Sequence, residues 1–211
     1  MAERNSERPA WPPAAVKEFE DKKLAPIATG DDLWGVTLDL LDAIAASFDE
    51  ADMSSRAVLS SALDEAAVQE WLGDTLNLRS GGRFHAGRET QIAHDDRPDL
   101  ILSSATSPDQ VAIEVKHGDK DWSLAALSNA LADQLAQRYL LSANRRHGVL
   151  VISHHRETRF WRDTVMKRRL SFSDIIAHLQ RQAERITSNS NGLVHVTVRG
   201  IDTTPGRKSS S

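Results

Sequence analysis

The apolar positions after residue 30 recur at three- and four-residue intervals, which is the spacing of one face of an α-helix. The first such stripe consists of Leu33, Val36, Leu40, Leu41 and Ile44, and it stops at the polar run DEADMSS. A second stripe runs from about Leu59 to Leu76. The hydrophobic pattern therefore predicts two helices in this part of the chain, the second ending before the run RSGG.

The pattern then shortens to segments with the composition of β-strands. These segments cover Arg83–Ala93, Asp99–Ser104 and Val111–Lys116, and the turn-rich runs HDDRP and SSATSPDQ separate them. A long amphipathic stretch, Ser123–Leu141, predicts a third helix, and the apolar run GVLVIS predicts a fourth strand.

The last part of the chain predicts one more helix and one more strand. Ser171 and Asp174 have the spacing of a capping box, and the apolar positions from Ile175 to Ile186 follow a helical period. The run LVHVTVR then alternates like a strand. Helices interleaved with strands in this order predict an α/β fold, in which a mixed central sheet is flanked by helices.

Composition places the chain among ordinary globular proteins. It has 211 residues, 40% of them hydrophobic and 27% charged, which fits one domain with a smaller appendage. No apolar run approaches the ~20 residues of a membrane helix. The start MAERNSERPAWPP lacks the apolar core of a secretion signal, so we expect a cytoplasmic protein without membrane contact.

Several kinds of chemistry lose their support from the sequence. The chain has no cysteine, which excludes disulfides, thiol nucleophiles, iron–sulfur clusters and cysteine zinc sites. It contains no GxSxG, Walker A or GxGxxG motif. Any metal must therefore bind carboxylates or histidines. The adjacent His154 and His155 are poor candidates as joint ligands, because neighbouring side chains in an extended strand point in opposite directions.

Charge is distributed unevenly around the formal net value of −4. Residues 31–78 hold eleven acidic residues and one basic residue, a net charge of −10, whereas residues 144–170 carry a net charge of +6. The two stretches are either solvated faces of opposite sign or, for the basic one, a surface that faces phosphates. In the second case we expect nucleic acid to be bound by Arg145, Arg146, Arg159, Arg162, Lys167, Arg168 and Arg169.

The candidate chemistry lies on the second and third predicted strands. Asp99 follows Pro98 at the start of one strand, and Glu114 and Lys116 share a face of the next. Taken singly, each could be an ordinary turn residue or a cross-strand ion pair. Together, however, two carboxylates on adjacent buried strands form a hard oxygen site suited to Mg²⁺, and a buried carboxylate requires a partner.

With PD on one strand and ExK on the next, residues 58–153 resemble the PD-(D/E)xK nuclease superfamily, which has a restriction-endonuclease-like αβββαβ core. The resemblance implies that Asp99 and Glu114 bind metal and that Lys116 is the catalytic lysine. It also implies an acidic residue from the first helix. Glu65 is favoured over Glu70, because Glu65 shares the apolar stripe of that helix whereas Glu70 points toward water.

A narrower resemblance is to the RecB-like nucleases, in which a glutamine and a tyrosine lie four residues apart on the following helix. Here Gln134 and Tyr139 lie five apart, so Gln134 is either a supporting residue or a helix-surface glutamine. The chain also resembles nuclease-like modules at the ends of larger bacterial proteins attributed to antiphage defence. Trp71, Trp122 and Trp161 are expected to be core or core-edge aromatics rather than platforms for base stacking.

We therefore expect a Mg²⁺-dependent deoxyribonuclease, with Mn²⁺ as a substitute for Mg²⁺. The expected organisation is an extended or disordered lead-in over residues 1–30, a helical extension over 31–57, the nuclease-like domain over 58–203 and a disordered tail over 204–211. The alternative is a catalytically silent module that binds nucleic acid or assembles with proteins. Under that alternative, the acidic N-terminal helices would dock onto a protein partner or a second copy of the chain.

Overall fold

The computed structural model describes residues 12–14, 17, 25–49, 59, 62, 64–88, 97–120, 122–163 and 167–204. Most of the expected lead-in and nearly all of the expected tail lie outside these residues, as do positions 50–57 of the expected helical extension. The second half of the first expected strand, residues 89–93, is also outside them.

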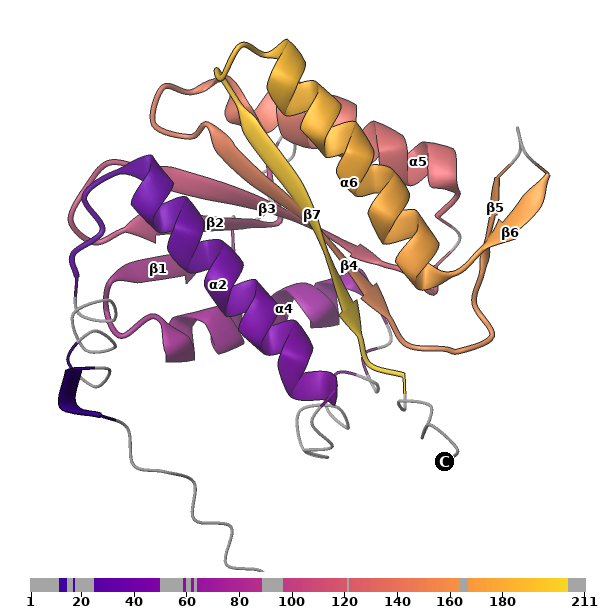
Figure 1. Cartoon of the computed structure of the whole chain (residues 1–211), viewed down its shortest axis with the longest axis horizontal. Helices are drawn as coiled ribbons and strands as arrows, with labels where there is room; N and C mark the ends of the chain where they lie inside the picture. The colour runs from indigo at the N-terminus through magenta and orange to yellow at the C-terminus, as the bar shows by residue number, and fades with distance from the viewer. Residues whose placement is uncertain are drawn as a thin grey trace, which may run out of the picture.

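A mixed five-stranded sheet forms the centre of the protein (Figure 1). Its strands are β1 (Phe84–Gly87), β2 (Leu100–Ser104), β3 (Gln110–His117), β4 (His147–His154) and β7 (His195–Asp202). They are ordered β1-β2-β3-β4-β7. The first three strands pair antiparallel, whereas β3, β4 and β7 run parallel. This arrangement confirms the predicted α/β class with a mixed sheet.

Helices cover both faces of the sheet (Figure 1). One face packs against α2 (Gly30–Asp49) and α4 (Glu65–Arg79). The other packs against the helical segment that follows β3 and against α6 (Phe172–Asn189). Alternate residues of β3 supply the two cores: Val111 and Ile113 face the first pair of helices, and Ala112 faces the second.

Helix α2, expected as an extension, belongs to the central core. Its Leu33, Leu41, Ile44 and Phe48 are buried in the same cluster as the sheet residues of β3. The helix lies across β3, β4 and β7, as the contacts between these elements also show (Figure 1). Burial of its apolar stripe against the sheet accounts for the helical period in the sequence.

Helix α4 begins later than its hydrophobic stripe predicts. Asp64 has an extended backbone, and its side chain accepts a hydrogen bond from the Ala67 N–H at 2.9 Å. An aspartate in this position satisfies one of the unpaired N–H groups at a helix start, so the helix begins at Glu65. The capping box predicted at Ser171 and Asp174 is confirmed at the start of α6.

The helix predicted over Ser123–Leu141 is present but changes its winding along its length. It begins as α5 (Leu124–Asn129), widens to a π-helix over Ala130–Arg138, labelled η1, and ends in a 3₁₀ turn over Tyr139–Leu141, labelled η2. The N–H of Tyr139 donates to the carbonyl of Gln134, which is the five-residue bond of a π turn.

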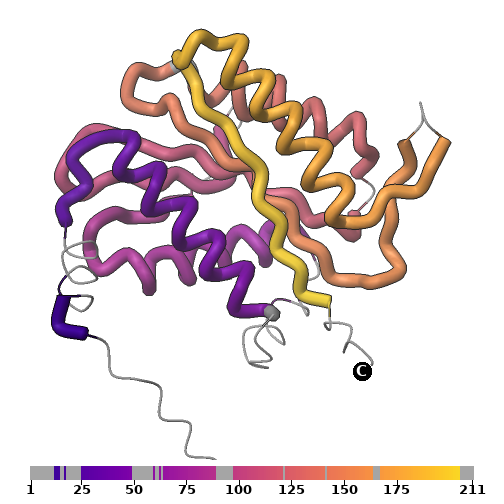
Figure 2. The backbone as a smooth tube through the Cα atoms, in the orientation of Figure 1, coloured from indigo at the N-terminus to yellow at the C-terminus, as the bar shows by residue number. Residues whose placement is uncertain are grey.

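A short hairpin follows β4, in a stretch where the sequence pattern predicted no strand. Its strands β5 (Trp161–Asp163) and β6 (Arg168–Leu170) pair antiparallel and form a separate two-stranded sheet. In Figures 1 and 2 the hairpin stands beside the start of α6 and outside the central sheet. Within the described ranges, the protein has no helix long and apolar enough to cross a membrane.

Candidate active site

The candidate site lies where β3 extends beyond the start of β2. The register pairs Leu100 with Ile113, so the preceding Asp99 lies opposite Glu114. Asp99 Oδ2 accepts a hydrogen bond from the Val115 N–H at 2.7 Å, in the place where a continuing β2 would accept one. The structure thus brings the two carboxylates predicted from the sequence to adjacent strands.

Lys116 forms ion pairs with one carboxylate from β3 and one from α4. Its Nζ lies 2.7 Å from Glu114 Oε1 and 3.1 Å from Glu65 Oε1. The Lys116 and Glu114 side chains are only 5% and 4% exposed, so this ion pair is largely removed from water. The ammonium also lies 4.9 Å from the centre of the Trp122 ring, which the sequence pattern had not connected with the site.

Glu65 reaches the site from the first residue of α4. Its second oxygen, Oε2, accepts a hydrogen bond from the His117 N–H at 3.3 Å, so Glu65 occupies the free edge of β3 beyond Asp99. Glu70 lies elsewhere: its side chain is 68% exposed, and its carboxylate is 3.8 Å from Arg88. The structure therefore brings Glu65, and not Glu70, to Lys116, as the stripe argument predicted.

Burial and mutual repulsion perturb the acidic groups strongly. Burial raises the pKa of Asp99 to about 6, although Lys116 and the Val115 N–H oppose the shift. The pKa of Glu114 is raised to about 7 by burial and by the charge of Asp99. For Lys116, burial by itself lowers the pKa, but Glu114 and Glu65 raise it more, so the amine stays protonated.

The donor set fits a hard divalent cation. Glu114 Oε2 is buried and has no hydrogen-bond partner among the described residues, and the same holds for the Gln134 side-chain oxygen. Among the described residues, no group of three or more His, Asp or Glu side chains is arranged to hold a metal ion. Mg²⁺ needs fewer, because one or two carboxylates suffice when water and a phosphate complete its shell. Asp99 and Glu114 could provide these ligands, with Glu65 beside them.

Tyr139 is a further residue of this region that the sequence pattern did not assign. Its ring is buried, and its pKa is raised by burial and then by the negative charges of Glu114 and Asp99. In an α-helix, residues five apart lie about 140° from each other around the axis. The π turn between Gln134 and Tyr139 contains one residue more than a turn of α-helix. The spacing of five residues between Gln134 and Tyr139, in place of four, was the signal in the sequence for this insertion.

The predicted nucleic-acid-binding residues fall into three groups. Arg145 and Arg146 lie just before β4, at the end of the sheet opposite Lys116, and Arg145 Nε donates to the Tyr139 carbonyl. Arg159 is engaged with backbone carbonyls. The remaining residues are exposed on the β5–β6 hairpin: Arg162, Lys167, Arg168 and Arg169. The seven residues thus do not form one continuous surface.

Histidines occupy the opposite face of the strand end from Lys116. The rings of His117 and His155 stack with centroids 4.2 Å apart, and His155 Nε2 lies 2.8 Å from Ser153 Oγ. Burial lowers the pKa of His155 to about 4, so this ring is neutral at pH 7. His154 points to the other side, where it stacks on Phe172 and lies 3.1 Å from Asp202.

Comparisons with protein-family models, with curated proteins and with solved structures found no match to this chain.

Proposed function

We propose that the protein is a metal-dependent nuclease that hydrolyses phosphodiester bonds in DNA. The observation that carries this proposal is the meeting of Asp99 and Glu114 with Lys116 at the end of β3 that extends beyond β2. Two desolvated carboxylates beside a buried ammonium combine ligands for a cation with a charge suited to a phosphate. The resemblance to modules from antiphage-defence proteins favours invading DNA as the substrate.

In this proposal Asp99 and Glu114 hold Mg²⁺ or Mn²⁺, with Glu65 completing or supporting the ligand set. The bound ion would polarise the scissile phosphate and lower the pKa of a bound water molecule. The raised pKa values of Asp99 and Glu114 support this role, because a cation between the two groups relieves their repulsion.

Lys116 is the proposed electrostatic stabiliser. Its side chain is held by Glu114 and Glu65, so its ammonium is oriented before any substrate arrives. A preorganised positive charge stabilises the negative charge that grows on the phosphate during attack by water. Glu65 is then a positioning residue for Lys116, in addition to any contact with the ion.

The hairpin supplies the proposed contacts to the DNA backbone. Arg162, Lys167, Arg168 and Arg169 are exposed there, and basic side chains that meet phosphates release counterions from DNA. Arg159 has a different role, because its guanidinium is bonded to backbone carbonyls of the protein.

A cleavage assay tests the proposal. The purified protein is incubated with plasmid, linear duplex and single-stranded DNA, and with RNA, in Mg²⁺, in Mn²⁺ and in chelator. We expect cleavage of DNA with either ion and none in chelator. Asp99→Ala and Glu114→Ala should each lower the rate at least about 100-fold, the scale for the loss of one transition-state contact. Glu65→Gln should lower it as well.

Glu70→Gln is the matched control, because Glu70 lies on the same helix and faces solvent. It should cleave at the rate of the parent. The proposal fails if no nucleic acid is cut and Mn²⁺ raises the melting temperatures of the parent and Asp99→Ala equally. That result would favour the catalytically silent module instead.

A further inference from the structure

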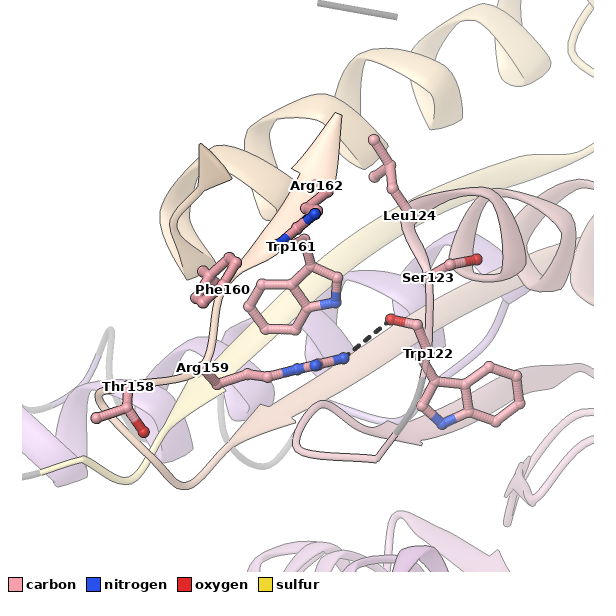
Figure 3. A pocket seen from close by; sticks show the side chains of 8 residues that line it. All are labelled: Trp122, Ser123, Leu124, Thr158, Arg159, Phe160, Trp161 and Arg162. Carbon is pink, nitrogen blue, oxygen red and sulfur yellow. Dashed lines mark hydrogen bonds between the residues drawn. The ribbon is translucent and has the colours of Figure 1, made fainter. Parts of the chain in front are cut away.

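A pocket of about 420 Å³ opens beside the candidate site (Figure 3). It lies between the segment that enters α5 and the segment that leads into β5. Its lining consists of Trp122, Ser123, Leu124, Thr158, Arg159, Phe160, Trp161 and Arg162. A volume of this size is within the range of about 300–1,000 Å³ found for small-ligand sites.

Arg159 fixes the shape of the pocket. Its guanidinium donates to the backbone carbonyls of Gly118 at 3.0 Å, Lys120 at 2.8 Å and Trp122 at 3.1 Å. Figure 3 shows Arg159 extended beneath Trp161 and bonded to the Trp122 backbone. The two walls are therefore tied together without a ligand, so little ordering is needed when one binds.

The walls of the pocket offer aromatic surface and one unused donor. The Trp122 and Phe160 rings are half-buried, whereas Trp161 is only 2% exposed. The indole N–H of Trp161 is buried and has no hydrogen-bond partner within the part of the chain that the structure describes, and Figure 3 shows this edge of the ring turned toward Ser123 and Leu124. An unpaired buried donor is unfavourable, so a ligand with an acceptor atom at this place would be stabilised.

The positive charge around the pocket favours flat ligands that carry a negative charge over flat cations. Arg159 and Arg162 line it, and the Arg169 guanidinium lies 3.8 Å from the centre of the Phe160 ring. Aromatic pockets also bind cations, but these arginines would repel one. A neutral planar ring attached to an anionic group fits both the rings and the charge, and a nucleobase with its phosphates has that chemistry.

Trp122 connects the pocket with the candidate site. Trp122 is one of the residues that line the pocket, and its ring lies 4.9 Å from Lys116 Nζ. We infer that the pocket binds an unpaired nucleobase of the strand whose phosphate lies at Lys116. This inference rests on the proposed nuclease function and gives its substrate class as DNA with an unpaired base at the cleavage point.

Binding measurements in chelator test the inference without cleavage. The probes are a fluorescent single-stranded oligothymidylate and an abasic oligomer of equal length and charge. Phe160→Leu keeps apolar volume but removes a stacking ring, and Trp71→Leu is a control on the opposite face of the sheet. Phe160→Leu should weaken oligothymidylate binding about 5- to 150-fold, which is the effect of one lost stacking contact. Trp71→Leu should not weaken it.

The abasic oligomer shows whether the ring acts on the base. The parent should bind it more weakly than oligothymidylate by a similar factor, and Phe160→Leu should bind both oligomers alike. Equal affinity of the parent for both oligomers overturns the inference, whether or not the variant folds. An equal loss for both oligomers in Phe160→Leu also overturns it. If the base dependence is present, but no nucleic acid is cut and Mn²⁺ raises the melting temperatures of the parent and Asp99→Ala equally, the nuclease proposal fails and the pocket assignment stands.

Discussion

Two polar clusters lie on opposite faces of the same strand end, and burial acts on them in opposite directions. On one face, burial raises the pKa of Asp99 to about 6 and of Glu114 to about 7. On the other face, burial lowers the pKa of His155 to about 4. Each group is driven toward its neutral form. His155 is neutral at pH 7, although the charge of Asp119 opposes the shift, whereas the carboxylates face Lys116 and stay close to ionisation.

The difference identifies which cluster is suited to chemistry. His155 has a hydrogen-bond partner in Ser153, and its ring stacks on His117. The carboxylate cluster retains a buried Glu114 oxygen that no described residue hydrogen-bonds, and repulsion between Asp99 and Glu114. Unsatisfied acceptors and stored repulsion favour the binding of a cation, so the carboxylate face is the better candidate for an active site.

Removal of the ammonium should give the largest change in stability. Lys116→Met leaves buried carboxylates without their cation, and loss of one partner from a buried pair costs about 3–5 kcal/mol. The loss, measured by urea denaturation at pH 8 in chelator, should shrink at pH 5, where Asp99 and Glu114 bind protons. Lys120→Met, at an exposed lysine of the next turn, should change little. An equal loss at both pH values would show that repulsion is not the cause.

Neutralising one carboxylate should stabilise the protein, by less than the loss of the ammonium destabilises it. The folded protein holds its proton on Glu114 up to about pH 7, above the ordinary pKa of 4.5, so the free energy of unfolding falls as pH rises through this window. Glu114→Gln mimics the protonated form and should stabilise the metal-free protein by about 1–3 kcal/mol at pH 8. The free energies of unfolding of the variant and of the parent are compared at pH 5 and at pH 8. A variant less stable than the parent at pH 8 would contradict this explanation.

A substitution on the histidine face should change stability the least. There the stability should rise with pH, whereas Glu114 makes it fall. The folded state resists protonation of His155 until about pH 4, below the ordinary pKa of 6.5. Stability is therefore present above pH 6.5 and is lost as pH falls between these values. His155→Gln should reduce this acid-side loss by about 1 kcal/mol, an amount discounted because the ring is partly exposed. Thermal unfolding between pH 7 and pH 4 measures this loss of stability. If the variant lost as much stability as the parent, the prediction would be contradicted.

The carboxylate site was largely predictable because its parts follow from strand alternation. Glu114 and Lys116 lie two residues apart on one strand, and Asp99 begins the neighbouring strand, so their side chains meet once the strands pair. The choice of Glu65 also followed from a periodic pattern, that of the apolar stripe on α4. In each case a local period determined the direction of a side chain.

Other features depend on contacts that no local pattern contains. The β5–β6 hairpin has strands of three residues, too short for an alternating signal, and the burial of Trp161 and Leu170 in the second core holds it in place. The π turn before Tyr139 arises from one extra residue within an amphipathic helix, where the apolar stripe still fits a regular α-helix. The pocket beside Trp122 needs segments from before and after β4, which only the fold brings together.

At the end of β3 that extends beyond β2, two backbone amides respond directly to what the site binds. The amide protons of Val115 and His117 are held by the carboxylates of Asp99 and Glu65 rather than by a neighbouring strand. A proton or an ion that draws these oxygens away would weaken both hydrogen bonds and loosen the strand end. Hydrogen exchange at these two amides would therefore read out the occupancy of the site directly, in a protein that need not turn over any substrate.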